Sequence, residues 1–344
     1  MLRALLCGTF LLVILNEFFI YFINQQFWNQ LTCKTENCTR ILLVADPQLL
    51  GHSFDVSFYS GFAITDSDRY LKKTFARAVG FSEPHIICFL GDLLDEGSAA
   101  SPEDYKKYVD RFRNIFYVNQ EVQRIHVPGD NDIGGENGEY ISNANIRRFE
   151  IEFTNNDIFD YSNKLRFFKI NRMLLDFMNP EKESNREKLR IGISHMPVLI
   201  AGGPLLRNIM GEIDPHVIFS AHWHESRIFR YPSTTSAQFY DNGVQTFNLG
   251  KLKADHEYLE IMVPTSSYRM GTYKIGYGFA VIDNENLDYT VLWNYSRFVF
   301  LKLYILWLAI ALIIALLLQL RIRCPKRLSA KRHRRNSLSL LPHF

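Results

Sequence analysis

Long apolar stretches lie near both ends of the chain and predict membrane helices. Residues 298–320 carry one charged side chain, Lys302, and residues 4–23 also carry one, Glu17. A bilayer core takes about 20 apolar residues in a helix, so each stretch is long enough to span it. The alternatives are a buried core helix for 298–320 and a cleavable signal peptide for 4–23. The first stretch is longer than a signal-peptide core and lacks a small-residue cleavage pattern after it, which favours an uncleaved anchor.

Between these stretches, short apolar runs are each followed by an acidic residue or a histidine. The runs are 41–45, 85–90, 124–127, 189–194 and 216–221, and the residues that follow them include Asp46, Asp92, Asp130, His195 and His222. Such runs are typical of strands that are buried on both faces. Apolar residues at helical spacing lie between them, at 71–79 and at 105–116 after a Ser101-Pro102 helix start. This alternation predicts an α/β sandwich.

The residues that follow these runs predict a metal site. In open α/β sheets, reactive groups collect at the carboxyl ends of the strands, and here three Asp and two His residues are delivered to that edge. A buried cluster of carboxylates and imidazoles is costly to desolvate unless bound cations compensate it. Mixed Asp, His and amide ligands suit Mn, Fe or Zn. The number of acidic groups suggests two ions that share a carboxylate.

Composition and charge narrow the class of protein. The chain has 344 residues, 47% of them hydrophobic, five cysteines and a net charge of +3, which excludes a disordered, collagen-like or disulfide-framework protein. The charge is unevenly distributed, because residues 24–297 hold 29 Lys and Arg against 35 Asp and Glu. An acidic domain repels phosphates, so we expect no nucleic-acid partner.

Basic residues beside the apolar stretches predict their orientation. Arg3 precedes the first stretch, and Arg321, Arg323, Lys326 and Arg327 follow the second. Basic flanks stay in the cytoplasm, so both termini are expected there and the middle of the chain in a lumenal or extracellular space. The predicted parts are a helix at 4–23, a domain at 24–297, a helix at 298–320 and a basic cytoplasmic tail at 321–344.

Charged residues within the stretches predict a contact between them. A carboxylate inside a span is expected to pair or to serve a function, and Glu17 and Lys302 lie at similar depths. We therefore expect these two side chains to pair. The alternative is that both extend to the membrane interface.

Cysteines and glycosylation patterns fit an oxidising compartment. Cys33 and Cys38 predict a local disulfide, and Cys88 lies in an apolar run as a buried free thiol. Asn37 heads an N-glycosylation pattern and is the predicted acceptor. Asn294 heads a second pattern only four residues before the span, too near the bilayer for modification.

Five ordered motifs resemble those of the calcineurin-like metallophosphoesterases. They are Asp46-Pro47-Gln48, Gly91-Asp92, Gly129-Asp130-Asn131-Asp132, Ser194-His195 and Ala221-His222-Trp223-His224. The corresponding family motifs read D-x-H, G-D, G-N-H-D/E, H and G-H-x-H. The resemblance covers about residues 41–283, in which 264–270 and 276–283 look like the family's closing strands. Segments 44–51 and 91–97, with the two flanking spans, are most similar to the metallophosphoesterase 1 branch.

The resemblance implies a fold, a cofactor and a ligand set. The fold is a metallophosphoesterase-type β-sandwich flanked by helices, and the cofactor is a pair of divalent ions, with Mn preferred over Fe or Zn. By position, one metal is held by Asp46, Gln48 and His224, the other by Asp130, His195 and His222, and Asp92 bridges them. In the family, such a pair holds phosphate oxygens and activates a water for in-line attack on phosphorus.

The sequence departs from the family motifs at three positions. Gln48 stands in place of a His and Asp130 in place of an Asn, and both residues can still offer an oxygen ligand. Asn131 stands in place of the His that usually protonates the leaving group, and an amide cannot give up a proton. His52 and Asp132 are the candidate substitutes for this catalytic role.

The resemblance also implies a substrate and a location. The branch removes an ethanolamine-phosphate side branch from glycosylphosphatidylinositol (GPI) glycans, which permits export of GPI-anchored proteins from the endoplasmic reticulum. The expected partners are GPI-anchored glycoproteins and the membrane of the endoplasmic reticulum, its exit sites or the Golgi. Tyr268 and Arg269 are candidates for substrate binding, or for a structural ion pair. The alternatives are a lumenal phosphatase for proteins or small molecules, and a metal-stabilised cargo receptor that binds the glycan without cutting it.

Overall fold

The computed structural model describes most of the chain. The described residues are 2–36, 38–52, 58–135, 139–153, 156–174, 176–177, 187–200, 202–233, 235–238 and 243–323. The predicted acceptor Asn37 and the basic tail from residue 324 lie outside them. The chain divides into two compact units, Met1–Phe19 with Arg297–Phe344, and Ile20–Ser296.

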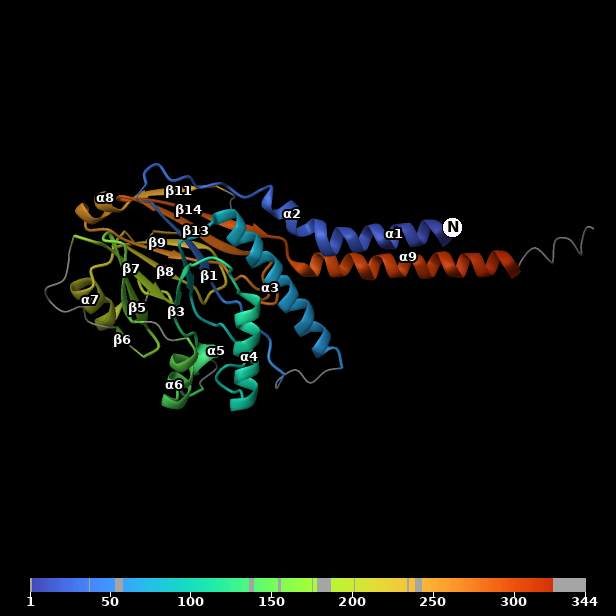
Figure 1. Cartoon of the computed structure of the whole chain (residues 1–344), viewed down its shortest axis with the longest axis horizontal. Helices are drawn as coiled ribbons and strands as arrows, with labels where there is room; N and C mark the ends of the chain where they lie inside the picture. The colour runs from blue at the N-terminus through green and yellow to red at the C-terminus, as the bar shows by residue number, and fades with distance from the viewer. Residues whose placement is uncertain are drawn as a thin grey trace, which may run out of the picture. The chain divides into compact units, whose positions relative to one another are not determined.

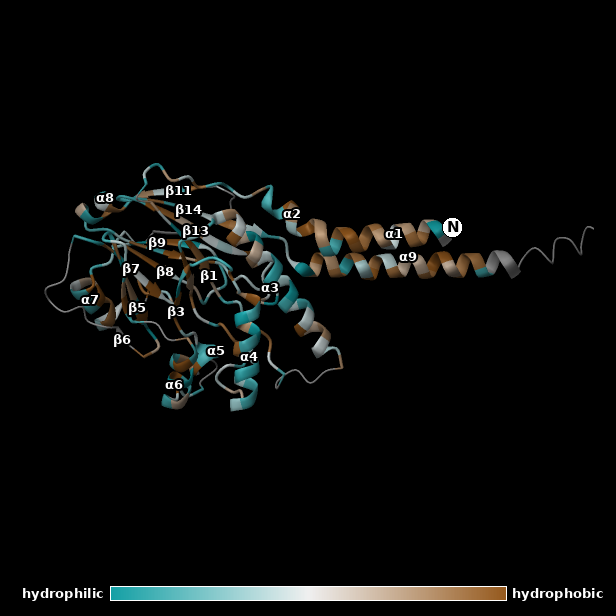
Figure 2. Cartoon of the chain, viewed as in Figure 1, coloured by the Kyte–Doolittle hydropathy of each residue, from teal (hydrophilic) through white to brown (hydrophobic). Residues whose placement is uncertain are grey.

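The first unit contains two apolar helical segments. Helix α1 (Leu2–Ile14) continues into a π-helical turn (Leu15–Phe19), and α9 spans Arg297–Arg323. Two helical stretches, Arg3–Gln25 and Arg297–Gln319, are long and apolar enough to cross a membrane. Figure 2 shows the predominance of hydrophobic residues on α1 and α9.

Glu17 forms an ion pair in this unit, but with a residue that was not predicted. Its carboxylate lies 2.7 Å from the Arg297 guanidinium and accepts a hydrogen bond of 2.8 Å from the Tyr304 hydroxyl. Arg297 is thus one partner of Glu17, and the pairing of Glu17 with Lys302 stays a prediction. Arg297 stands one residue before the predicted span, outside the stretch whose charged residues were expected to pair.

The second unit is built on two β-sheets (Figure 1). The first sheet has the order β11-β14-β13-β1-β2-β3, and the second has the order β10-β9-β12-β8-β7-β5-β4, with β6 paired to β5. The first sheet comprises β1 (Thr39–Val44), β2 (Ile86–Phe89), β3 (Gln123–His126), β11 (Gln245–Asn248), β13 (Ile275–Asp283) and β14 (Asn286–Asn294). The second comprises β4 (Ile158–Tyr161), β5 (Leu165–Asn171), β6 (Asp176–Phe177), β7 (Leu189–Ser194), β8 (Val217–Ser220), β9 (Arg227–Tyr231), β10 (Thr235–Gln238) and β12 (Tyr258–Met262).

Apolar clusters lie between successive layers of the second unit, which are helices, the first sheet, the second sheet and a further helix. Helices α3 (Ser60–Ser82) and α4 (Pro102–Ile115) pack on the first sheet, the two sheets pack on each other, and α7 (Gly203–Glu212) packs on the second sheet. Alternate residues of β1 show the arrangement, since Ile41 and Leu43 face the second sheet while Leu42 and Val44 face the helices. The remaining helices are α2 (Ile20–Gln25), α5 (Asp130–Ile133), α6 (Asn143–Glu152) and α8 (Leu249–Ala254).

The mixed α/β fold with two sheets agrees with the prediction. All five predicted runs form strands, and the Ser101 side chain accepts a hydrogen bond from the Asp104 N–H at the start of α4. The predicted closing strand at 276–283 lies within β13, but 264–270 is a loop with one bridge residue, Thr265, paired to Ala45. A disulfide joins Cys33 to Cys38, and Cys88 is a buried free thiol, as predicted.

Candidate metal centre

Strand register brings the predicted ligands to one edge of the sandwich. In the first sheet, parallel pairing aligns Val44 with Phe89 and Phe89 with His126, so the loops that follow β1, β2 and β3 start side by side. In the second sheet, β7 and β8 are also parallel, with Ile193 opposite Phe219. The two sheets face each other, so five strand ends deliver side chains to a common site.

One group of possible ligands comprises Asp130, His195 and His222. Asp130 Oδ1 lies 2.9 Å from His195 Nε2 and 3.3 Å from His222 Nδ1. The two imidazoles are also close, with 3.2 Å between His195 Nε2 and His222 Nδ1. One ligand atom from each residue lies within 4.8 Å of the others, which is the spacing that a shared ion requires.

A second group comprises Asp46, Asp92 and His195. Asp46 Oδ1 lies 3.8 Å from His195 Nδ1, and Asp92 Oδ1 lies 3.5 Å from His195 Nε2. The three residues are almost fully buried, with exposed fractions of 0%, 2% and 2%. Because His195 belongs to both groups, the two sets of ligand atoms form one continuous cluster.

Gln48 and His224 lie beside this cluster. Gln48 Nε2 donates a hydrogen bond of 2.9 Å to Asp92 Oδ2 and lies 3.5 Å from His224 Nε2. The structure therefore brings together all seven residues that the sequence proposed as ligands: Asp46, Gln48, Asp92, Asp130, His195, His222 and His224.

Backbone strain marks the same residues. Asp46, Gln48, Asp92, His222 and His224 all have positive φ angles, between 38° and 76°. Non-glycine residues rarely adopt this conformation, and such strain concentrates at functional sites. These residues follow β1, β2 and β8, so the positive φ angles accompany sharp turns after three of the five strands that end at the site. This signal is absent from the sequence.

Burial shifts the pKa values of the clustered residues, because water no longer compensates the charge of their carboxylates. Desolvation raises the pKa of Asp46 and of Asp92. Burial disfavours protonation of His195, but the surrounding carboxylates of Asp92, Asp130 and Asp46 outweigh it and raise its pKa to about 10. Burial lowers the pKa of His224 to about 4, which keeps that imidazole neutral and available as a ligand. The carboxylates thus draw positive charge into a buried site.

The chemistry of the donors fits divalent metal ions. The Asp46 Oδ2 atom is buried and has no hydrogen-bond partner among the described residues, a costly arrangement that a bound cation would relieve. His195 Nδ1 lies 2.8 Å from the carbonyl oxygen of Leu90, and donation to it would leave Nε2 free to ligate. Carboxylate, imidazole and amide groups together match the preferences of Mn, Fe or Zn.

Two buried carboxylates hold the loops that carry the predicted ligands. The sequence analysis predicted this role for neither of them. Asp132 accepts hydrogen bonds from the N–H groups of Leu93, Leu94 and Gly129, and so ties the loop after β2 to the loop after β3. Glu260, in β12, accepts from the N–H groups of Val198 and Leu199, in the loop that follows His195.

Asn131 and the two residues proposed to replace it as proton donor lie in different surroundings. Asn131 contacts Asp92 directly, since its side-chain amide and its backbone N–H each donate to that carboxylate at 3.0 Å. Asp132 is fully buried and engaged in loop contacts. His52 packs its ring against Tyr108, and its backbone N–H donates to the Tyr108 hydroxyl.

The described contacts of the substrate-binding candidates do not involve the cluster. Tyr268 is 2% exposed, and its hydroxyl donates to Asp66 on α3 at 2.9 Å. Arg269 donates its backbone N–H to the Ser267 hydroxyl at 3.4 Å. A role of Tyr268 and Arg269 in substrate binding stays a prediction.

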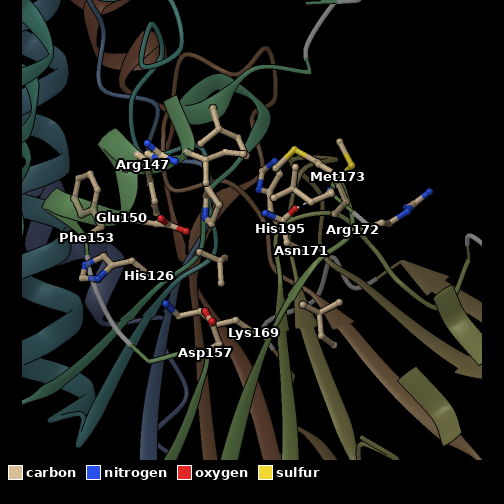
Figure 3. Close-up of a pocket in the computed structure, with 18 of the residues that line it drawn as sticks. His126, Arg147, Glu150, Phe153, Asp157, Lys169, Asn171, Arg172, Met173 and His195 are labelled. Atoms are coloured by element: carbon tan, nitrogen blue, oxygen red, sulfur yellow. Dashed lines mark hydrogen bonds between the residues drawn. The ribbon is translucent and has the colours of Figure 1, made fainter. Parts of the chain in front are cut away.

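A cavity of about 640 Å³ adjoins the cluster at His195 (Figure 3). Its lining combines apolar side chains such as Phe149 and Phe153 with charged ones such as Arg147 and Glu150, all four from or directly after α6. Burial lowers the pKa of Lys169, which lines its floor from β5. The cavity is large enough for a sugar-sized group next to the metal ligands.

Comparison with known proteins identifies similar sequences. A family model described as calcineurin-like phosphoesterase matches residues 39–226. A metallophosphoesterase 1 homolog from Caenorhabditis elegans is 28% identical over 225 residues, which cover 62% of this chain and 59% of the relative. Metallophosphoesterase 1 from Pongo abelii is 27% identical over 206 residues, which cover 57% of this chain and 50% of the relative. The chain therefore matches half to three fifths of the length of these relatives.

Solved structures align only weakly. A purple acid phosphatase from yellow lupin (Lupinus luteus) seeds covers 76% of this chain and 53% of its own length, with 11% identity and a TM-score of 0.46. GAP50 of Plasmodium covers 74% of this chain and 84% of its own, with 10% identity and a TM-score of 0.42. Both scores lie below 0.5, so neither alignment bears on the assignment.

Proposed function

The chain belongs to the calcineurin-like phosphoesterase family, and on this premise we propose that it is a membrane-anchored phosphoesterase with a dinuclear metal site. The family match and the relatives confirm the resemblance that the motifs predicted. The observation that carries the proposal is the convergence of carboxylates and imidazoles in one buried cluster, in which Asp46 Oδ2 lacks a hydrogen-bond partner among the described residues.

The ligands would divide between two ions as the motifs suggest. Asp46, Gln48 and His224 would hold one ion, Asp130, His195 and His222 the other, and Asp92 would lie between them. Two divalent ions, with Mn preferred, would supply Lewis-acid stabilisation of the phosphoryl oxygens and acidify a water. Gln48 would have to turn its amide oxygen toward the metal, because its Nε2 now donates to Asp92.

The protein's own residues fix the geometry of the reaction. Asn131 holds the Asp92 carboxylate through two hydrogen bonds, while Leu90 and Glu260 orient His195 and the loop after it. The cavity beside His195 would receive the part of the substrate that is not cleaved. Positioning a phosphate ester in this way lowers the entropic part of the barrier.

We infer that the substrate is an ethanolamine-phosphate side branch on a GPI glycan. The proposal places residues 24–297 in the lumen of the endoplasmic reticulum or Golgi, with helices at 4–23 and 298–320 crossing the membrane. Two apolar helices and the similarity to the metallophosphoesterase 1 relatives support it. A tether would confine the enzyme to the surface that carries its lipid-linked substrate and raise their effective concentration.

The test uses the purified full chain in lipid nanodiscs, supplied with Mn and a GPI glycan that bears the side branch. Release of ethanolamine phosphate is expected, and Asp92→Asn should reduce it at least about 100-fold, because loss of a shared ligand exceeds the effect of losing a supporting contact. Asp110→Asn, on the exposed face of α4, is the matched control and should leave the rate unchanged.

Other outcomes would select a different function. Tight binding of the glycan to metal-loaded protein without release would identify a cargo receptor, a possibility that the absence of a His at position 131 supports. Turnover of simple phosphomonoesters but not of the glycan would identify a phosphatase.

A further inference from the structure

Aromatic side chains are exposed at the start of helix α3. Phe58 and Phe62 have exposed fractions of 101% and 70%, and Tyr59 between them is 52% exposed. Phe58 packs edge-on against Tyr59, with 5.4 Å between ring centroids. Large aromatic side chains that project together from a helix start mark an interaction surface, because their exposure to water is unfavourable.

Cations continue this surface along the outer face of α3. The exposed residues of the helix after Phe62 are Thr65, Arg69, Lys72, Ala76 and Gly80, which recur at helical spacing on one side. The acidic residues of α3 face elsewhere: Asp66 is buried against Tyr268, and Asp68 pairs with Arg111 at 2.7 Å. The outer face is therefore aromatic at its start and basic in its middle, without an exposed acid.

The same helix packs against the end of an apolar segment. Helix α2 forms the last part of the helical stretch Arg3–Gln25 and contacts α3. Arg77 lies over the Phe22 ring at 3.6 Å, and Lys73 lies over the Tyr21 ring at 4.9 Å. Cations that stack on aromatic rings at the end of a span are typical of the membrane interface.

We propose that the outer face of α3 rests on the membrane surface. The side chains of Phe58 and Phe62 enter the boundary between headgroups and acyl chains, and Arg69 and Lys72 bind anionic lipid headgroups. The charge of the face and its continuity with α2 select a bilayer over a protein partner. The inference rests on the membrane anchoring in the proposed function.

This contact would orient the metal site relative to the lipid surface. The ligand Gln48 lies ten residues before Phe58, and Arg111 links the two regions because it pairs with Asp68 of α3 and donates to the Leu50 carbonyl at 2.9 Å. Contact between α3 and the bilayer would therefore bear directly on the loop that carries Gln48.

The experiment is site-specific photo-crosslinking in the full chain. Benzoylphenylalanine replaces Phe62, Ile313 or Asn208, one at a time, in protein reconstituted in nanodiscs, and lipid adducts are measured by mass spectrometry. Ile313 is exposed on α9 and reports whether that helix enters the bilayer. Asn208 is exposed on α7, which covers the opposite face of the sandwich, and is the negative control.

Adducts at positions 62 and 313, with none at 208, are expected. An adduct at 313 with none at 62, or equal yields at 62 and 208, would overturn the inference and leave the anchoring intact. Absence of an adduct at 313 would overturn the anchoring and the inference with it.

A charge reversal tests the headgroup contact. With phosphatidylserine in the nanodiscs, the adduct yield at position 62 should be at least about twice that in phosphatidylcholine alone. Combining Arg69→Glu with Lys72→Glu should remove the difference. Equal yields in the two lipids before the reversal would contradict the binding of anionic headgroups.

Discussion

Asn131 stands where the family motif has the His that usually protonates the leaving group. Its side-chain amide donates to Asp92 Oδ2 at 3.0 Å, so in this protein the residue stabilises a carboxylate of the cluster. An amide has no proton to transfer at neutral pH. The consequence is that rates should depend strongly on how well the leaving group departs without help.

Substitution of Asn131 by His should supply the missing acid. General acid catalysis contributes about 100-fold or more, and we expect Asn131→His to raise the rate on an alkyl phosphodiester at least about tenfold. The rate on a nitrophenyl ester should change little, because that group leaves without protonation. Both rates are measured by steady-state kinetics with Mn.

A conservative variant separates protonation from packing. Asn131→Gln keeps an amide and should not favour the alkyl ester over the nitrophenyl ester. If Asn131→His changed both rates by the same factor, protonation of the leaving group would not be the explanation.

At the scale of elements, glycines set the distance between the strand-end loops. A Cβ added at Gly129 would overlap the Asp92 carboxylate, and one added at Gly91 would overlap the His195 ring. Glycine at these two positions therefore lets one strand-end loop pack closely against a predicted metal ligand from another strand end. Gly91 also has a positive φ angle, which glycine adopts readily in a turn.

Gly129→Ala should displace Asp92 and weaken metal binding. We expect a loss of about 10-fold or more in Mn affinity, comparable to the loss of a supporting contact around a metal site. Calorimetric titration of the full chain in detergent measures the affinity.

Gly211→Ala is the matched control for this change, because an added Cβ has no neighbour within 4 Å there and the position lies in helix α7. This variant should bind Mn normally and gain up to about 1 kcal/mol of stability. Normal Mn affinity in both variants would show that the loop after β3 tolerates a side chain next to Asp92.

At the scale of the whole molecule, the two terminal segments are joined by a buried charge pair. Glu17 and Arg297 are separated by 280 residues, and their side chains are 12% and 3% exposed. The Arg297 guanidinium also donates to the carbonyl oxygen of Asn16 at 2.9 Å. Both side chains are largely shielded from water, so removal of one leaves the other charge poorly compensated.

Removal of one partner should destabilise the protein strongly. We expect Glu17→Gln or Arg297→Gln to cost about 3–5 kcal/mol, the usual penalty for an uncompensated buried charge. The exchange of the two residues, Glu17→Arg with Arg297→Glu, should recover part of this loss. Thermal unfolding of the full chain in detergent measures each variant.

An exposed contact between the same helices provides the comparison. Thr9 accepts a hydrogen bond of 2.9 Å from the Trp307 indole, and Thr9→Ala should cost less than about 1 kcal/mol. A similar cost for Thr9→Ala and Glu17→Gln would contradict the dependence of the structure on the charge pair.

Much of this protein follows from local sequence. The apolar stretches, the five strands and the residues that end them depend on hydrophobic periodicity and on turn residues, which neighbouring positions determine. The order of the motifs was therefore sufficient to identify the family, and the spacing of Cys33 and Cys38 to predict their disulfide.

Only the tertiary structure decided how these parts meet. Asp46 and the backbone of His222 lie 3.3 Å apart although 176 residues separate them, and the structure assigns β1, β2 and β3 to one sheet and β7 and β8 to the other. The buried supports Asp132 and Glu260 and the partner of Glu17 were equally out of reach of the sequence. Such contacts depend on sheet order and on packing between distant segments, which local periodicity does not encode.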